Sequence, residues 1–168
     1  DLPDKLYDPR YYGMTLSQRL AYEQAKHELL LDLPEDDITS HTIFRLFTAL
    51  QQIVSGFWNH SLPNGRRIQE VFPHMRLDML CDALASIPDG DKVIVWTKYH
   101  YSLDAIVALL TDQHGPGAVA QFHGQLSECE RHAQLDRWRA SGRFLVATQA
   151  AGGHGLTLNE AHYAVFYE

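Results

Sequence analysis

Residues 143–167 read RFLVATQAAGGHGLTLNEAHYAVFY, and this stretch decides the fold. Two short apolar runs, at 143–148 and 163–167, flank a glycine-rich loop. Apolar runs of this length, bounded by glycine, are typical of strands that are buried in a sheet. The stretch therefore predicts a strand, a loop and a second strand.

Further apolar runs lie upstream and alternate with helical periods. KVIVWT at 92–97 and AVAQFH at 118–123 predict two more strands. A helix capped by Ser102 is expected between them, and the capping-box pair Ser127 and Glu130 opens another helix after the second. Strands that alternate with helices predict an α/β fold, a parallel sheet flanked by helices.

The front of the chain carries helical patterns instead. Helices are expected over 15–32, opened by a capping box of Thr15 and Gln18, over 42–58 and over 73–87, with a turn at 63–65. We expect residues 1–90 to form a helical extension packed on the lobe. The sheet-bearing lobe is expected over 91–168.

The composition is that of a folded globular domain. Of its 168 residues, 45% are hydrophobic and 21% are charged, which is close to the average of soluble globular proteins. The length suits one domain, or one compact domain with an appendage. The net charge of −7 argues against a protein that holds nucleic acid by bulk charge alone. Nine of the 21 acidic residues lie within the first 40, so the remainder is closer to neutral.

The sequence also gives expectations for the cellular location of the protein and for the extent of the chain. Two cysteines without a CxxC pair, no long apolar run and no signal-like start predict a reducing compartment, the cytoplasm or, in a eukaryote, the nucleus, without membrane association. The first residue is not methionine and the last apolar run reaches the final residues. We therefore expect an excised part of a longer protein, incomplete at its C-terminus.

The glycine-rich loop has the chemistry to approach a phosphate. Gly152, Gly153 and Gly155 let the main chain bend and approach an anion closely, and Thr148 and Gln149 add hydrogen-bonding groups. A tight connection without a ligand is the alternative. No Gly-Lys pair of a Walker A loop is present and no GxGxxG fingerprint follows a strand, so the chain alone is not expected to hydrolyse ATP.

Three segments in order resemble the second RecA-like lobe of Swi/Snf-type superfamily-two DNA helicases and translocases, in their bacterial and phage forms. KVIVWTKYHYSLDAIVALL resembles motif IV, AQFHGQLSECERHAQLDRWRASGRFLVAT the block after it, and TQAAGGHGLTLNEAHYAVFYE motif V. The resemblance covers roughly residues 10–168 and is specific after 90. It implies the RecA-like, P-loop-NTPase-like form of the α/β fold.

The resemblance also implies a set of residues that contact the nucleic-acid backbone without reading sequence. They are Thr97, Lys98, Gly124, Thr148 and Gln149. The implied partners are DNA and the first RecA-like lobe of the same polypeptide. Arg131 is instead expected to hold its helix in a salt bridge.

The nucleotide is assigned on the same basis. Gly153 and Gly155 correspond to glycines that approach ATP when the two lobes close, with Mg²⁺ held elsewhere in the full-length protein. Motif VI, whose arginines stabilise the transferring phosphate, does not occur before Glu168. The resemblance therefore implies no catalytic residue in this part and no bound cofactor.

Other functions stay open on the sequence alone. The alternative function is a non-enzymatic protein-interaction module on the same fold, in which the acidic front helices bind a protein partner. Cys129 and His132 form a C-x-x-H pair, but a zinc site needs more ligands at workable spacing, so no metal is expected. His154 in the glycine loop either binds a phosphate or caps the loop.

Overall fold

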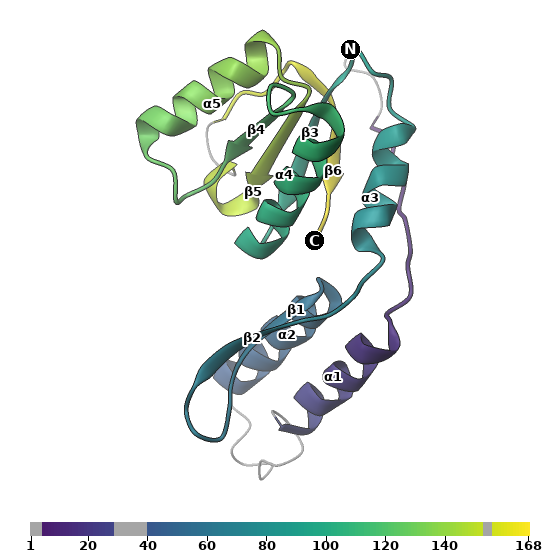
Figure 1. Ribbon diagram of the computed structural model, residues 1–168, viewed down its shortest axis with the longest axis vertical. Helices are drawn as coiled ribbons and strands as arrows, with labels where there is room; N and C mark the ends of the chain where they lie inside the picture. The colour runs from purple at the N-terminus through teal and green to yellow at the C-terminus, as the bar shows by residue number, and fades with distance from the viewer. Residues whose placement is uncertain (1–4, 29–39, 153–155) are drawn as a thin grey trace. The chain divides into compact units, whose positions relative to one another are not determined.

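The computed structural model describes residues 5–28, 40–152 and 156–168. Its chain divides between Met79 and Leu80 into two compact units, and each is described by itself. Figure 1 shows the elements of both units. Helix α3 (Arg76–Ala85) runs across the division.

The C-terminal unit is built on a four-stranded sheet. Its strands are β3 (Lys92–Thr97), β4 (Val119–Phe122), β5 (Phe144–Thr148) and β6 (Ala161–Phe166). They follow the order β4-β5-β3-β6, and every pairing is parallel. The predicted α/β fold with a parallel sheet is confirmed.

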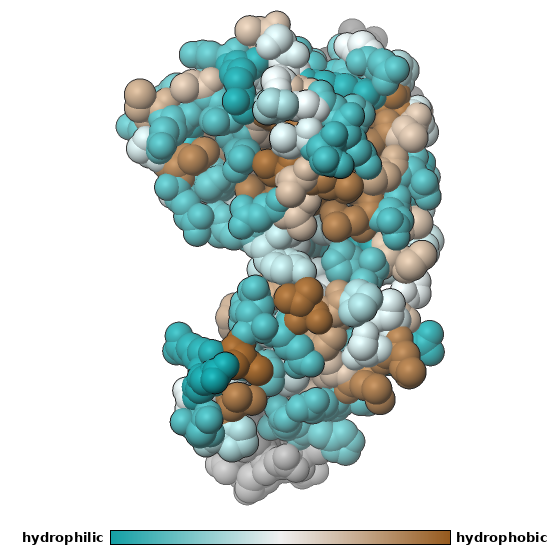
Figure 2. All heavy atoms as spheres, in the orientation of Figure 1, coloured by the Kyte–Doolittle hydropathy of each residue, from teal (hydrophilic) through white to brown (hydrophobic). Residues whose placement is uncertain are grey.

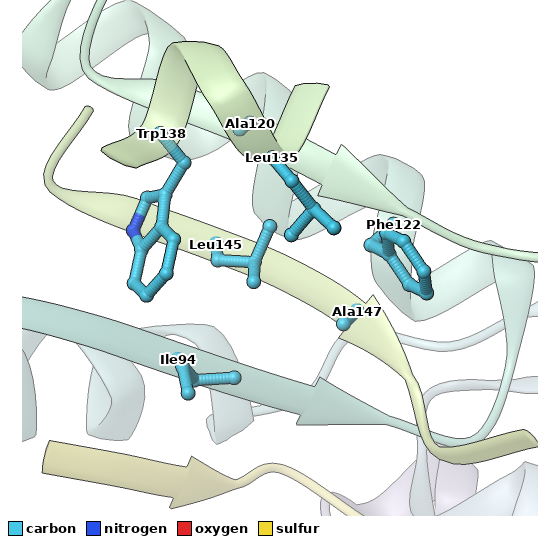
Figure 3. Close-up of a cluster of buried hydrophobic side chains, with 7 residues drawn as sticks. All are labelled: Ile94, Ala120, Phe122, Leu135, Trp138, Leu145 and Ala147. Atoms are coloured by element: carbon cyan, nitrogen blue, oxygen red, sulfur yellow. The ribbon is translucent and has the colours of Figure 1, made fainter. Parts of the chain in front are cut away.

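Alternation along the strands gives the sheet two apolar faces. On one face, helix α5 (Glu128–Ala140) places Leu135 and Trp138 over Leu145 and Ile94, as Figure 3 shows. The rest of this cluster consists of Ala120, Phe122 and Ala147. Phe144, the residue before Leu145, instead contacts His114 of helix α4 (His100–His114), with ring centroids 4.8 Å apart. Helices α5 and α4 therefore cover opposite faces.

Serine caps were expected at the starts of two helices of this unit, Ser127 for α5 and Ser102 for α4. Ser127 and Glu130 form the predicted capping box at α5. Helix α4 begins two residues earlier than its expected cap, and its N-cap Tyr99 makes no side-chain capping bond. Ser102 lies inside the helix, where its buried hydroxyl donates to the Glu168 carboxylate. The predicted cap was wrong because the helix already begins at His100, so that Ser102 lies in its first turn.

The N-terminal unit contains two helices and a hairpin. Helix α1 (Leu16–Lys26) begins with the predicted capping box of Thr15 and Gln18, and its predicted continuation toward 32 runs into residues outside the described part. Helix α2 (Ser40–Val54) follows. The buried Gln18 side chain donates to the carbonyls of Ile53 and Val54, at 2.8 and 3.1 Å, and so ties α1 to the end of α2.

The antiparallel hairpin of β1 (Phe57–Ser61) and β2 (Arg67–Val71) corrects the helix expected to reach 58. Gly56 has a φ of +95° and its N–H donates to the Ile53 carbonyl, which ends α2 in the manner of a glycine C-cap. Phe57 had the right spacing for the helix but belongs to the strand. The predicted turn is confirmed, with Gly65 at φ +81°.

Large apolar side chains reach the surface of the N-terminal unit. Figure 2 shows brown, hydrophobic residues at the surface of this unit. The large apolar and aromatic side chains of the unit that are more than half exposed are Leu6, Tyr7, Tyr11, Leu16, Leu20, Ile43, Phe44, Phe47, Val71 and Met75. In the described part of the chain, no helix is both long and apolar enough to cross a membrane.

Candidate functional site

Three neighbouring strands end together at the carboxyl edge of the sheet. Thr97 of β3 is in register with Thr148 of β5, and Phe122 of β4 with Ala147 of β5. The loops that follow these strands therefore emerge side by side. Ligands of open α/β sheets bind at this edge because the loops there expose backbone and polar side chains.

A hollow of about 370 Å³ lies at this edge. Its lining comes from the ends of all three strands and from the first turns of α4 and α5, and consists of Lys98, His100, Gly124, Arg131, Thr148, Ala150 and Ala151. Sequence positions 98, 124 and 148 are far apart along the chain but meet here. Three of the five residues assigned to nucleic-acid contact are thus brought together: Lys98, Gly124 and Thr148.

The charges of the hollow are positive. Lys98 and Arg131 both line it, and no carboxylate does among the described residues. The Arg131 guanidinium lies 5.9 Å from the centroid of the Phe122 ring, an arrangement that orients a cation without neutralising it. The salt bridge expected for Arg131 is not formed among the described residues. The hollow is therefore suited to an anion.

His100, which lines the hollow, packs against a second histidine, His123. His100 meets His123 edge to face, with ring centroids 5.1 Å apart. Burial lowers the pKa of His123, the nearby His100 lowers it further, and the Asp104 carboxylate opposes both effects. His123 is therefore neutral at pH 7. In both rings Nδ1 is buried without a hydrogen-bond partner among the described residues.

The other assigned residues differ in exposure. Thr97 is 0% exposed, and its hydroxyl is buried without a hydrogen-bond partner among the described residues. Thr148 is 5% exposed but borders the hollow. Gln149 begins the short helix α6 (Gln149–Gly152) and donates through Nε2 to the Glu168 carbonyl at 3.3 Å. The contact assigned to Thr97 stays a prediction, and it would have to come from a buried side chain.

The glycine loop is described only at its start. Gly153 and Gly155, assigned to the nucleotide, and His154 lie outside the described residues. A Cβ on Gly152 would overlap two atoms of the Trp96 indole, so the main chain at the loop entrance packs directly on that ring. Only glycine fits this close approach without a shift of the ring or the chain.

The sequence did not assign two of the ionisable residues that line the hollow, His100 and Arg131. His100 was overlooked because its helix was expected to start later. Arg131 was expected in a salt bridge because nothing in the sequence indicates which way its side chain points. Among the described residues, no three His, Cys, Asp or Glu side chains gather in a way that could hold a metal ion.

Comparison of the sequence with known proteins identifies similar helicases. The profile described as "Helicase conserved C-terminal domain" matches residues 75–168, more than half of the chain. The chain is also 30% identical over 105 residues to "DEAD-box ATP-dependent RNA helicase 40" of Oryza sativa subsp. japonica. That match covers 61% of this chain but only 13% of the relative.

Solved structures agree on the fold. The chain matches the "Sulfolobus solfataricus SWI2/SNF2 ATPase C-terminal domain" with a TM-score of 0.66 at 21% identity, over 92% of this chain and 68% of the other. It also matches the ATPase core domain, with a TM-score of 0.72 at 22% identity, over 99% and 35%. The same core "in complex with dsDNA" gives 0.69 at 21%, over 92% and 33%.

Proposed function

Because the chain belongs to the family of helicase conserved C-terminal domains, we propose that it is the second motor lobe of an ATP-dependent DNA helicase or translocase. In this role it contributes contacts to the nucleic-acid backbone and part of the ATP site between two lobes. The observation that carries the proposal is the cationic hollow at the carboxyl edge of the sheet, lined by Lys98, Arg131, Gly124 and Thr148.

The chemistry of this hollow suits a phosphate. Lys98 and Arg131 supply positive charge, the exposed Gly124 leaves the main chain accessible, and Thr148 supplies a hydroxyl. Contacts of these kinds fix position along a strand without reading bases. Support for DNA comes also from the similar archaeal core that was solved with dsDNA. The similar rice protein is named an RNA helicase, so RNA is the alternative ligand to test.

ATP and Mg²⁺ are proposed to bind only in the full-length protein, which contains both lobes. The chain has no Gly-Lys-Ser/Thr segment, so the group that grips the β and γ phosphates has to come from a first lobe. Gly153 and Gly155 are the residues proposed to approach the nucleotide. Closure of the two lobes would complete the site, as in other enzymes that assemble a site by domain closure.

The proposal is tested by the binding of a fluorescein-labelled duplex to the 168-residue chain. We expect a Kd in the range of roughly 10⁻⁴ to 10⁻⁶ M that weakens steeply with salt. Lys98→Ala and Arg131→Ala should each weaken binding by about three- to tenfold and lower the salt slope by about 1. Fluorescence anisotropy at several salt concentrations measures both quantities.

Arg45→Ala is the control for loss of one positive charge. Arg45 is exposed on α2 and contributes nothing to the hollow. The same titration with a labelled RNA of equal length decides between the two ligands. Equal effects of all three substitutions would exclude the hollow as the binding site, and absence of binding to either nucleic acid would favour a protein-interaction module.

A further inference from the structure

Glu168 joins three segments at the carboxyl edge of the sheet. Its carboxylate accepts a hydrogen bond from the backbone N–H of Lys98 at 2.6 Å and another from the Ser102 hydroxyl. Its carbonyl accepts from Nε2 of Gln149 at 3.3 Å. The residue thus links the end of β6 to the segment after β3 and to the segment after β5.

The position of Glu168 is fixed by the sheet. The N–H of Tyr167 donates to the Trp96 carbonyl at 2.9 Å and so continues the pairing of β6 with β3 to the residue before Glu168. The hydrogen-bonded end of β6 therefore positions the Glu168 side chain at the start of α4.

The Glu168 carboxylate lies at the start of α4. The N-cap Tyr99 supplies no side-chain bond, and the first backbone N–H groups of a helix lack partners within the helix. A carboxylate near a helix N-terminus is also favoured by the helix dipole. Ser102 is 2% exposed, so its hydroxyl would be costly to leave unpaired. Glu168 supplies the acceptor for the Ser102 hydroxyl and for the backbone N–H of Lys98, two residues before the first residue of the helix.

We propose that Glu168 is a positioning residue of the nucleic-acid site, holding Lys98 and Gln149 in the arrangement that meets the phosphate backbone. The inference rests on the proposed function, because it gives these two residues a ligand. Lys98 lines the hollow, and its backbone N–H is the group that Glu168 holds. Gln149 directly follows Thr148, which also lines the hollow.

The negative charge of Glu168 and its hydrogen bonds are expected to change nucleic-acid binding in opposite directions. A carboxylate near a site for a polyanion repels the ligand, so removal of its charge alone should strengthen binding. Loss of its side-chain hydrogen bonds should instead loosen Lys98 and the first turn of α4 and weaken binding. Glu168→Gln removes the charge but keeps an oxygen for the Lys98 N–H and an amide N–H for the Ser102 hydroxyl. Glu168→Ala removes the charge and the side-chain bonds together.

The experiment compares these variants in the 168-residue chain by anisotropy with the labelled duplex. Glu168→Gln is expected to bind at least as tightly as the unaltered chain, and Glu168→Ala about fivefold more weakly than Glu168→Gln. Ser102→Ala, which removes one of the two side-chain bonds, should weaken binding in the same direction by a smaller factor. Asp112→Ala removes an exposed negative charge at the far end of α4 and should not weaken binding.

Hydrogen exchange of the backbone amides supplies a readout that does not depend on the ligand. The Lys98 amide and the first turn of α4 should exchange faster in Glu168→Ala than in Glu168→Gln. Binding by Glu168→Ala as tight as by Glu168→Gln, or equal exchange in the two, would overturn this inference alone. Failure of the unaltered chain to bind any duplex would overturn the proposed function as well.

Discussion

Replacing Trp138 with alanine is expected to lower the free energy of unfolding of the C-terminal unit by about 3–5 kcal/mol. The indole is 0% exposed and fills the space between α5 and the sheet beside Leu135 and Leu145 (Figure 3). A cavity of that size is not refilled by neighbours held in a sheet. Urea unfolding followed by circular dichroism measures the change.

The surroundings of Trp138 add to this effect. Its Nε1–H donates to the Arg143 carbonyl at 3.3 Å, and the Lys92 ammonium lies 5.4 Å from the ring centroid. The same ammonium donates to the Trp138 and Gly142 carbonyls and thereby ties β3 to the end of α5. Loss of the ring removes the bond to the Arg143 carbonyl and the contact with the Lys92 ammonium, whereas the two carbonyl acceptors of Lys92 remain.

Trp138→Phe is the matched control. It keeps most of the buried apolar volume and loses the N–H donor, so we expect it to be less than half as destabilising as Trp138→Ala. Similar losses for both variants would assign the effect to the hydrogen bond rather than to packing. A loss under about 1 kcal/mol for Trp138→Ala would contradict the assignment of this residue to the core.

Gly56→Ala is expected to destabilise the N-terminal unit by about 2–4 kcal/mol. Two penalties combine at this residue. Its φ of +95° is unfavourable for any residue with a Cβ, and that Cβ would overlap the imidazole of His74. Hydrogen exchange of the amides of α2 and β1 measures the loss in this unit separately from the other.

Gly65→Ala separates the two penalties. Gly65 has a φ of +81°, but a Cβ at this residue would meet nothing within 4 Å, so only the backbone penalty of about 1 kcal/mol applies. The double variant Gly56→Ala with His74→Ala should recover part of the loss. An equal effect of the two glycine substitutions would show that His74 moves aside at little cost.

Local sequence signals predicted most of the C-terminal unit. The buried runs at 92–97 and 143–148 are strands because an apolar segment of that length fits a sheet covered on both faces. The two capping boxes were visible because a cap and its partner lie three residues apart. These features depend on neighbours in the chain.

The predictions that were wrong concern the start of α4, the end of α2 and the side chain of Arg131. The Ser102 hydroxyl, which was expected to cap α4, instead donates to Glu168, 66 residues later in the chain. The end of α2 depends on one glycine that adopts a positive φ, although the apolar spacing continues through Phe57. The orientation of Arg131 depends on the Phe122 ring on a neighbouring strand. Contacts between distant segments decided the first and the last, and a single sequence does not reveal them.

The site was predicted in part. The resemblance to helicase motifs assigned Lys98, Gly124 and Thr148 to nucleic-acid contact, and the structure brings these three residues together around the hollow. Their roles toward nucleic acid stay predictions.

The most direct measurement is a map of backbone amide shifts in the ¹⁵N-labelled chain on addition of a short duplex. We expect the shifts to concentrate at the carboxyl edge of the sheet, around Lys98, His100, Gly124, Arg131 and Thr148. Shifts confined to the opposite edge, where β3 and β5 begin at Lys92 and Phe144, would contradict it.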